Sequence, residues 1–414
     1  MLKGAPTYPS QISVREAIDF IKANTPSLGT ESLNLADAYG RVLAKDVKSL
    51  VSHPSCDNSA LDGYACRAED TRAATKQAPV TLKVIGDVPA GSQFNKQLGE
   101  GEAVGIYTGA PIPSGANAII RVEDTKLIGD TVQLFTPASP NDIRPKGQDF
   151  MAGETLLQAG TKLNAAALGM AAAMGQANLE VVRPPRIGIL ATGDEVIEPG
   201  QPIREGQVYN SNSYSLYGLV KAAGAQVILL PHVKDDQASL AKAISDAGQP
   251  DLLLTSGGVS MGKYDFVRDL LFDEGEVYFW KVAMKPAGPV LFGRWQGLPI
   301  LGLPGNPVSS MVAFLILARA FIHEAAGLQE PLPYENRLTA TSKLTLKAAG
   351  FKETFIRLKL EQKDGVFYAD STGSQSSGVL SSMLYADALA CLAPHTSVQA
   401  GERVELIPLA PYLS

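Results

Sequence analysis

The segment LLLTSGGVSMGKYDF, residues 252–266, contains a serine whose role can be interpreted in two ways. Gly258-Val-Ser260-Met-Gly262 fits the G-x-S-x-G pattern, in which a hydrolase places a nucleophilic serine between a strand and a helix. The same segment fits an anion-binding loop, because a strand that ends in Ser-Gly-Gly exposes its backbone amides to a phosphate. The sequence thus allows either a nucleophilic Ser260 or a cradle for an oxyanion.

The surroundings of this serine favour the cradle. A nucleophile elbow turns tightly around its serine, whereas Gly257-Gly258 break the turn before Ser260 is reached. A base is also hard to place, because His323 lies at the far end of an apolar helix and His395 lies in the C-terminal part of the chain. A serine hydrolase that uses Ser260 therefore remains the alternative hypothesis.

Two further polar loops follow apolar runs, Thr192–Glu195 after RIGILA and LPGNPVS after LPILG. Ligands of open parallel sheets bind at the carboxyl ends of the strands, so the three loops predict one binding site. In the last loop we expect Asn306 to cap a helix and Pro307 to be its first residue, which leaves the amides of that helix free for an anion. The predicted ligand-binding residues are Thr192, Gly193, Asp194, Ser256, Gly257, Gly258, Ser260, Pro304, Gly305 and Asn306.

Charged residues near these loops suggest a metal and an anion. Asp194, Glu195 and Asp265 would repel a phosphate unless a divalent cation stood between them. Mg²⁺ is usually held by one or two carboxylates together with substrate phosphates and water, so the sequence predicts Mg²⁺ with these three acids as ligands. Lys281 and Lys285 in FWKVAMKP offer the opposite charge, although a solvated basic strand explains them equally well.

The elements that must position these loops follow from residue periodicity. Residues 186–326 alternate between strand and helix patterns as βαβαβ, which predicts a mostly parallel sheet with helices on both faces. Residues 13–24 predict a helix with a capping box formed by Ser13 and Glu16. Residues 78–138 contain short β-rich runs separated by turns, and helical patterns before and after them indicate that this β block is an insertion.

Other local signals complete the prediction. A helix that follows the β block is expected to have Asn164 as its N-cap and to stop at Gly175. The chain beyond about residue 335 is predicted to be all β, with a hairpin turn at Lys363-Asp-Gly365. At 414 residues we expect two to four domains.

Composition excludes several classes of protein. A formal net charge of −6 argues against a nucleic-acid binder, which normally has a basic surface. The three cysteines show no C-x-x-C spacing, so neither a disulfide framework nor a thiolate zinc site is predicted, and a reducing cytoplasm is expected. The N-terminus lacks an apolar targeting segment, and the most apolar helix is predicted to be short and interrupted by Arg319, so no membrane span is expected.

Seven segments together resemble one family, the molybdopterin molybdenumtransferases of the MoeA and gephyrin E-domain type. They occur in the family's order over nearly the whole chain, and they are DNSALDGYA, TGAPIPSGANAII, IRPKGQDFMAGE, LATGDEV, TSGGVSMGKYDF, FWKVAMKP and GLPGNPVSS. The resemblance implies a multidomain α/β plus β fold and an elongated homodimer. The expected domains are a discontinuous helical and mixed linking domain (1–46 and 145–182), a β-rich inserted domain (47–144), a three-layer α/β/α molybdopterin-binding domain (183–327) and a C-terminal β-barrel-like domain (328–414).

The resemblance also implies an activity. The protein would bind adenylylated molybdopterin and molybdate, place molybdenum on the dithiolene sulfurs, and cleave the pyrophosphate link to release AMP with Mg²⁺ present. Each active site would be shared between two subunits, and transient contacts with the molybdopterin adenylyltransferase and with recipient molybdoenzymes are expected. A scaffold of the same fold without catalysis is a further alternative.

Site residues carry over from the resemblance by position. The acids implied to be functional are Asp62, Asp149, Glu195, Asp235 and Asp265. The implied functional cations are Lys281, Lys285 and Arg357, Pro286 is implied to bind the cofactor, and Ser377 is implied to lie near the oxyanion, with Ser376 as the other candidate for that position. The chain departs from the family pattern at Cys56, Leu61 and Gln148, and it has Ala287 where the family usually has glycine. The Ala287 change most affects the expected molybdate pocket, because a Cβ can crowd backbone that must approach the anion.

Overall fold

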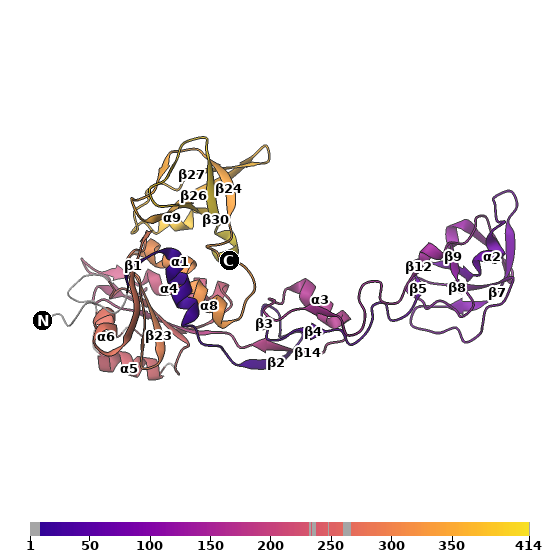
Figure 1. Cartoon of the computed structure of the whole chain (residues 1–414), viewed down its shortest axis with the longest axis horizontal. Helices are drawn as coiled ribbons and strands as arrows, with labels where there is room; N and C mark the ends of the chain where they lie inside the picture. The colour runs from indigo at the N-terminus through magenta and orange to yellow at the C-terminus, as the bar shows by residue number, and fades with distance from the viewer. Residues whose placement is uncertain (1–8, 232, 234–236, 247, 260–265, 414) are drawn as a thin grey trace.

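The protein is elongated, with a large body at one end and a small β-rich lobe at the other (Figure 1). The computed structural model describes residues 9–413 except 232, 234–236, 247 and 260–265. A linking region of short strands and one helix, α3 (Ala165–Ala173), joins the lobe to the body. The body itself contains an α/β sheet and, beside it, a C-terminal β domain. This arrangement confirms the predicted multidomain α/β plus β fold class.

A seven-stranded sheet forms the middle layer of the body, in the order β1-β20-β22-β23-β19-β15-β18. The strands are β1 (Ser10–Ile12), β15 (Arg186–Ala191), β18 (Gln226–Leu229), β19 (Leu252–Ser256), β20 (Glu276–Val282), β22 (Leu291–Trp295) and β23 (Leu298–Leu303). Neighbouring strands are parallel except where β22 is involved, so β22 alone runs against the other six. The mostly parallel sheet predicted from the sequence is confirmed.

Helices cover both faces of this sheet. Along β15, Ile187 and Ile189 belong to one core and Leu190 to the other, as the period of two residues in a strand requires. The first core also contains residues of α1 (Val14–Ala23), α4 (Ser211–Ala222) and the helical stretch 307–325. The second core contains residues of α5 (Gln237–Asp246) and α6 (Phe266–Glu274). The predicted three-layer α/β/α architecture is therefore confirmed.

The first strand and helix belong to the body. β1 pairs with β20, and the apolar face of α1 is buried in the first core. The helix begins as predicted, because the amide of Ser13 donates to the Glu16 carboxylate at 2.8 Å and the amide of Glu16 donates to the Ser13 hydroxyl at 3.2 Å. The assignment of all of residues 1–46 to the linking domain is thus wrong for β1 and α1, whose apolar residues are buried against the sheet. The other domain limits stay predictions.

A long apolar helical stretch runs through the core of the body. It consists of α7 (Pro307–Ala313), a π-helical segment η3 (Phe314–Ala318) and α8 (Arg319–Ala325). Within the described residues it is the one helix long and apolar enough to cross a membrane, but 78% of it is buried inside the protein, as in the core helix of a soluble protein. The apolar helix is longer than expected, and Arg319 lies within it. The guanidinium of Arg319 lies over the Tyr412 ring, 4.7 Å from the centroid.

The linking region contains two small sheets. β2 (Thr30–Asn34), β14 (Asn178–Val182) and β3 (Val42–Leu43) form one, and β4 (Val47–Lys48) pairs with β13 (Thr155–Leu157) to form the other. Helix α3 begins at its predicted cap, since the amide of Ala167 donates to Asn164 Oδ1 at 2.9 Å. Gly175 follows the helix with a φ of +84°, which agrees with the predicted stop.

The distal lobe is a six-stranded sheet in the order β10-β11-β7-β8-β6-β9. Its strands are β6 (Gly63–Cys66), β7 (Val80–Val88), β8 (Glu102–Ile106), β9 (Ala118–Arg121), β10 (Thr125–Ile128) and β11 (Thr131–Leu134), and β5 (Asn58–Ser59) pairs with β12 (Ile143–Arg144) at its base. Gly63 lies where β6 pairs with β9. This glycine opens β6, and an added Cβ would lie 1.9 Å from the Ile120 carbonyl oxygen, so close backbone approach requires it.

The C-terminal β domain is a closed five-stranded barrel. β24 (Leu338–Ser342), β26 (Glu353–Lys363), β27 (Val366–Ser371), β28 (Ala388–Leu392) and β30 (Arg403–Pro408) form the ring, which the β26–β28 pairing closes. Asp364 and Gly365 have positive φ between paired Lys363 and Val366, so the predicted hairpin turn is confirmed. The short strand β21 (Met284–Lys285) of the body pairs with the start of β26, which sets Lys285 opposite Thr354.

Candidate active site

The three predicted loops converge because three strands end at the same level. Ala191 of β15 is paired with Ser256 of β19, and Ser256 is paired with Leu303 of β23. The loops that follow are joined by backbone hydrogen bonds, since the amide of Gly257 donates to the Leu303 carbonyl at 2.9 Å and the amide of Thr192 donates to the Ser256 carbonyl at 3.4 Å. The carboxyl edge of the sheet thus forms one continuous surface of backbone and small side chains.

The two glycines after β19 are required by this convergence. Gly257 and Gly258 have φ values of +100° and +69°, which L-residues with side chains rarely adopt. A Cβ on Gly257 would lie 3.0 Å from Thr192 Oγ1. With glycine at both positions, no side chain covers the backbone amides at this edge of the sheet. A phosphate bound by amide groups requires such access.

Asn212, near the start of α4, holds two of these loops together, and sequence reasoning missed it. Its Nδ2 donates to Ser256 Oγ and to the Gly305 carbonyl, both at 2.7 Å. Its buried Oδ1 has no hydrogen-bond partner within the part of the chain that the structure describes. The signal in the sequence was the polar run NSNSYS at the start of a helix that follows a strand.

The helix after the third loop begins differently from the prediction. Pro307 is its first residue as expected, but the side chain of Asn306 makes no capping hydrogen bond. The amide of Val308 is not free for a ligand, because it donates to the Ser377 carbonyl at 3.1 Å. This bond brings the segment 374–377, which precedes the short helix α9 (Ser381–Leu384) of the C-terminal domain, against the edge of the sheet.

A pocket of about 810 Å³ opens between the sheet edge and the barrel. Asn306 and Ser309 at the start of α7 line it, and so do five residues of the Lys-Pro segment, from Lys285 to Pro289. The cationic side chains on its lining are Lys285, Lys347, Lys352 and Arg357, and no Asp or Glu is found among the described residues that line it. The site is therefore strongly electropositive in a protein whose net charge is −6.

Lys347 and Lys352 are the pocket cations that sequence reasoning missed. They belong to β25 (Leu346–Lys347) and to the turn that precedes β26, more than sixty positions beyond Lys285. Only the pairing of β21 with β26 brings the two segments together. The sequence offered no more than two lysines near Arg357 in TLKAAGFKETFIR.

Arg357 is the most constrained cation of the pocket, with 1% of the residue exposed. Its Nε donates to Ser382 Oγ at 3.0 Å, and Nη2 donates to the carbonyls of Ser374 and Ser376 at 3.2 Å. No carboxylate forms an ion pair with it in the part of the chain that the structure describes, and burial lowers the pKa of the guanidinium. A buried cation without a counter-ion is costly, so an anionic ligand would stabilise it.

The predicted Ser377 and its alternative Ser376 both line the pocket, and Pro286 and Ala287 do so on the opposite wall. Ala287 adopts a φ of +74° and is 4% exposed. The residue that departs from the family pattern thus occupies a backbone conformation that favours glycine.

Lys281 lies apart from this pocket. Its Nζ stands over the Trp280 ring, 4.2 Å from the centroid, and it is not among the residues that line the pocket. The structure therefore groups Lys285 with Arg357 and leaves Lys281 on the neighbouring strand β20.

The predicted metal ligands are only partly described. Asp194 and Glu195 are exposed at the end of β15. A Cβ on Gly193 would lie 2.7 Å from Glu195 Oε2, so the carboxylate folds over the glycine backbone. Across the described residues no group of three or more His, Cys, Asp or Glu could hold a metal. Asp265, together with Asp235 and Ser260, lies outside the described residues.

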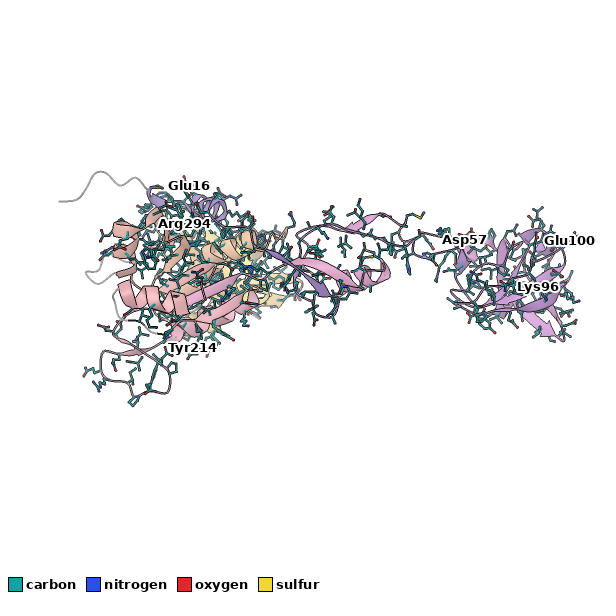
Figure 2. All side chains as sticks on the ribbon, turned by 90° about the horizontal axis from the view of Figure 1, so that it is seen from below. Glu16, Asp57, Lys96, Glu100, Tyr214 and Arg294 are labelled. Carbon is teal, nitrogen blue, oxygen red and sulfur yellow. The ribbon has the colours of Figure 1, made fainter. Side chains whose placement is uncertain are left out.

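Asp62 and Asp149 are in a different part of the molecule. Both are exposed on the lobe side, and Figure 2 shows their neighbour Asp57 at the base of the lobe, far from Tyr214 and Arg294 of the body. Asp62 Oδ1 accepts hydrogen bonds from the amide and the hydroxyl of Thr108, at 2.7 and 2.8 Å, and these bonds lower the pKa of the Asp62 carboxyl. Within one chain these two acids do not meet the sheet edge.

Family models match three parts of the chain. Residues 12–175 match the MoeA N-terminal region (domain I and II), residues 188–324 a probable molybdopterin binding domain, and residues 339–409 the MoeA C-terminal region (domain IV). A solved structure of the molybdopterin biosynthesis protein MoeA from Pyrococcus horikoshii has a TM-score of 0.81 at 29% identity and covers 96% of this chain and 99% of its own.

Curated relatives agree with these matches. A molybdopterin molybdenumtransferase from Nostoc is 36% identical over 97% of this chain and 95% of its own length. Molybdopterin molybdenumtransferase 2 from Mycobacterium tuberculosis is 43% identical over 80% of this chain and 83% of its own. These relatives are transferases, which gives the serine hydrolase alternative no support. The chain belongs to the molybdopterin molybdenumtransferase family.

Proposed function

We propose that this chain acts in molybdenum cofactor biosynthesis by inserting molybdenum from molybdate into adenylylated molybdopterin, with Mg²⁺-dependent release of AMP. The observation that carries the proposal is the pocket lined by Lys285, Lys347, Lys352 and Arg357, with no acid among its described lining residues. Molybdate is a tetrahedral dianion, and a guanidinium fork with several ammonium groups suits such an oxyanion. The pocket also reaches the sheet edge through Asn306.

The phosphate groups of the substrate would lie along that edge. The open backbone at Gly257 and Gly258 offers amide donors, and Asn212 keeps the loops of Ser256 and Gly305 in place. A pyrophosphate held there would place the pterin end toward the cationic pocket. Cleavage of the phosphoanhydride bond would then release AMP from the outer end of the edge.

The residues at the end of β15 fit a bound Mg²⁺. Asp194 and Glu195 are adjacent, exposed carboxylates, and Mg²⁺ typically takes one or two carboxylates together with phosphate oxygens and water. Asp194 and Glu195 would hold the ion, with Asp265 as the third predicted ligand, and the ion would supply counter-charge to the pyrophosphate. The carboxylates themselves would otherwise repel the substrate.

A second subunit would complete the site. Asp62 on the lobe and Asp149 near its base are exposed and have no route to the sheet edge of their own chain, so we propose a homodimer in which the lobe of one chain serves the body of the other. The other functional predictions, Asp235 and Lys281, are kept as part of this shared site. We also propose a cytoplasmic location, with transient contacts to the adenylyltransferase and to recipient molybdoenzymes.

The direct test is to incubate the protein with adenylylated molybdopterin, Mg²⁺ and molybdate, and to measure AMP release and molybdenum retained on the pterin. Molybdate-dependent AMP release is expected. Binding of the substrate without AMP release at any molybdate concentration would instead indicate a non-catalytic scaffold.

Two variants separate the ends of the site. Glu195→Ala should lose AMP release at every molybdate concentration, because the counter-charge to the leaving group is lost while the oxyanion pocket remains. Arg357→Ala should keep nucleotide binding and recover part of its activity at high molybdate, since one charge-assisted contact contributes about 1.5–3 kcal/mol, or one to two decades of affinity. Because Arg357 also bonds to the barrel backbone, Lys285→Gln should be tested beside it, with melting temperatures for both.

A further inference from the structure

A second cavity lies on the other side of the body, away from the sheet edge. Its volume is about 350 Å³, and it is enclosed by α8, the connection 328–336, the C-terminal helix α10 (Ala410–Leu413) and Lys162 of the linking region. The proposed reaction uses none of these residues. Two side chains of α8, Arg319 and His323, line the cavity.

Each side chain has one buried nitrogen, Nη1 of Arg319 and Nε2 of His323, that finds no hydrogen-bond partner among the described residues. His323 is 9% exposed, so its imidazole is almost fully enclosed. The two residues are four positions apart and therefore lie on the same face of the helix. Buried polar nitrogens normally have partners, so a pair of unpartnered ones on one cavity wall indicates a missing ligand.

The charges of the cavity favour an anion. Arg319 stacks on Tyr412, and no carboxylate forms an ion pair with it within the described part of the chain. Lys162 adds a second positive charge, while Glu330 is the one acid among the described lining residues and is itself exposed. Asn336 Nδ2 donates to the Tyr412 hydroxyl oxygen at 2.8 Å, which leaves the hydroxyl proton available to a ligand.

The protonation state of His323 determines which kind of anion the cavity can bind. Burial lowers the pKa of His323, and the nearby positive charges of Lys22 and Arg319 lower it further, while a hydrogen bond with the backbone of Glu330 opposes the shift. A neutral imidazole has one acceptor nitrogen and one donor nitrogen. A ligand that offers an ionised oxygen to Arg319 and a hydroxyl group to His323 would satisfy both.

We propose that this cavity is a binding site for a protonated oxyanion of the hydrogenphosphate type, held between Arg319 and His323. The anion would accept from Arg319 Nη1 through an ionised oxygen and donate its own proton to His323 Nε2. Because Lys162 lines the same cavity, the bound anion would also contact the base of the linking region. Free phosphate has such a proton at neutral pH, and a small phosphate monoester has one in its monoanionic form.

A crystal of the wild-type protein soaked in arsenate tests the site directly, because arsenate has the protonation chemistry of phosphate and arsenic gives an anomalous signal. An arsenic peak between Arg319 and His323 is expected, with arsenate oxygens within hydrogen-bond distance of Arg319 Nη1 and His323 Nε2. Absence of that peak, when arsenate occupies the pocket around Arg357 in the same crystal, overturns the proposal.

Calorimetric titration with inorganic phosphate supplies the second measurement. Phosphate affinity at this cavity should fall at least about tenfold in Arg319→Gln, and Lys162→Gln should weaken it less. Arg357→Gln is the matched control, since it removes a cation of the other pocket and should leave this binding event intact. Equal phosphate binding in wild type and Arg319→Gln overturns the proposal.

The identity of the anion is tested by comparison. Sulfate has no proton to donate at neutral pH, so it should bind at least about tenfold more weakly than phosphate. Sulfate that binds as tightly would overturn the assignment to a protonated oxyanion. Glycerol 3-phosphate that binds as well as phosphate would identify a monoester as the ligand, and its exclusion would identify the free ion. AMP release by Arg319→Gln is measured in parallel, so that a loss of phosphate binding at this cavity can be distinguished from a loss of the proposed activity.

Discussion

The body and the lobe hold their predicted site residues in opposite ways. In the body, Lys285 and Arg357 are brought together by strand pairing, and Arg357 is fixed by three hydrogen bonds to the barrel. In the lobe, Asp62 and Asp149 are exposed, and the lobe stands well away from the body (Figure 1). One chain can thus preorganise the oxyanion pocket by itself, whereas the acids of the lobe need another surface to act on.

Mixing two inactive variants tests whether the acids of the lobe act on the body of a second chain. We expect this experiment to give the largest change in activity. Asp62→Ala and Glu195→Ala should each lower AMP release by about a hundredfold or more, since Glu195 would hold the Mg²⁺ that supplies the counter-charge and Asp62 is a predicted catalytic acid of the same site. Random mixing of the two variants should restore about a quarter of wild-type activity, because half of the dimers then contain one intact site.

Subunit exchange must be proven in the same sample, for example by mass spectrometry of tagged chains. If exchange occurs and activity does not return, the lobe does not serve the body of a second chain. Mixing Asp62→Ala with Asp149→Ala is the matched control. Both acids of a site come from the same chain, so each of the two sites in a heterodimer lacks one of them. No activity should return if both acids serve the reaction.

Substitution of the cations missed by sequence reasoning tests the preorganised pocket. Lys352→Gln should weaken molybdate binding about tenfold, because one charge-assisted contact is lost, and Lys347→Gln should act in the same direction. Lys363→Gln, at the exposed hairpin end of β26, is the matched control and should change nothing. Molybdate dependence of AMP release measures all three, and an unchanged dependence in both pocket variants would show that these lysines do not contact the anion.

Substitution of a glycine at the sheet edge should measurably lower the stability of the protein. Gly257→Ala forces a Cβ onto a residue with a φ of +100° and places it 3.0 Å from Thr192 Oγ1. We expect the free energy of unfolding to fall by about 1–2 kcal/mol, and the affinity for adenylylated molybdopterin to fall as well. Gly218→Ala is the control, because this position is helical with nothing within 4 Å of the added Cβ. Urea unfolding measures both, and equal stability of the two variants would contradict the role given to Gly257.

The smallest expected effect concerns the carboxylate of Asp62. Hydrogen bonds from Thr108 lower its pKa in the folded state, so the group stays ionised at neutral pH and loses this stabilisation only as the pH falls through the folded-state pKa. Thr108→Val removes the hydroxyl donor and should raise the pKa toward the ordinary value, which an NMR titration of the Asp62 side-chain carbon detects. Activity near neutral pH should be nearly unchanged, and a pKa unaffected by the substitution would show that the hydroxyl bond does not form.

Much of the local structure was determined by short stretches of sequence. The capping box at Ser13, the cap at Asn164 and the hairpin at Asp364-Gly365 were all predicted correctly, because each depends on residues within one turn of the chain. The convergence of the three loops could also be predicted, since carboxyl ends of parallel strands share one edge.

The tertiary structure alone decided the features that depend on residues far apart in the chain. The sequence did not indicate that Lys347 and Lys352 join Lys285, because the β21–β26 pairing that unites them links segments about seventy residues apart. The need for glycine at position 63 comes from the carbonyl of Ile120, and the amide of Val308 is occupied by Ser377. Periodicity and capping residues determine the type and the ends of each helix and strand. The contacts between these elements, and hence the charge of the pocket, depend on how the whole chain packs.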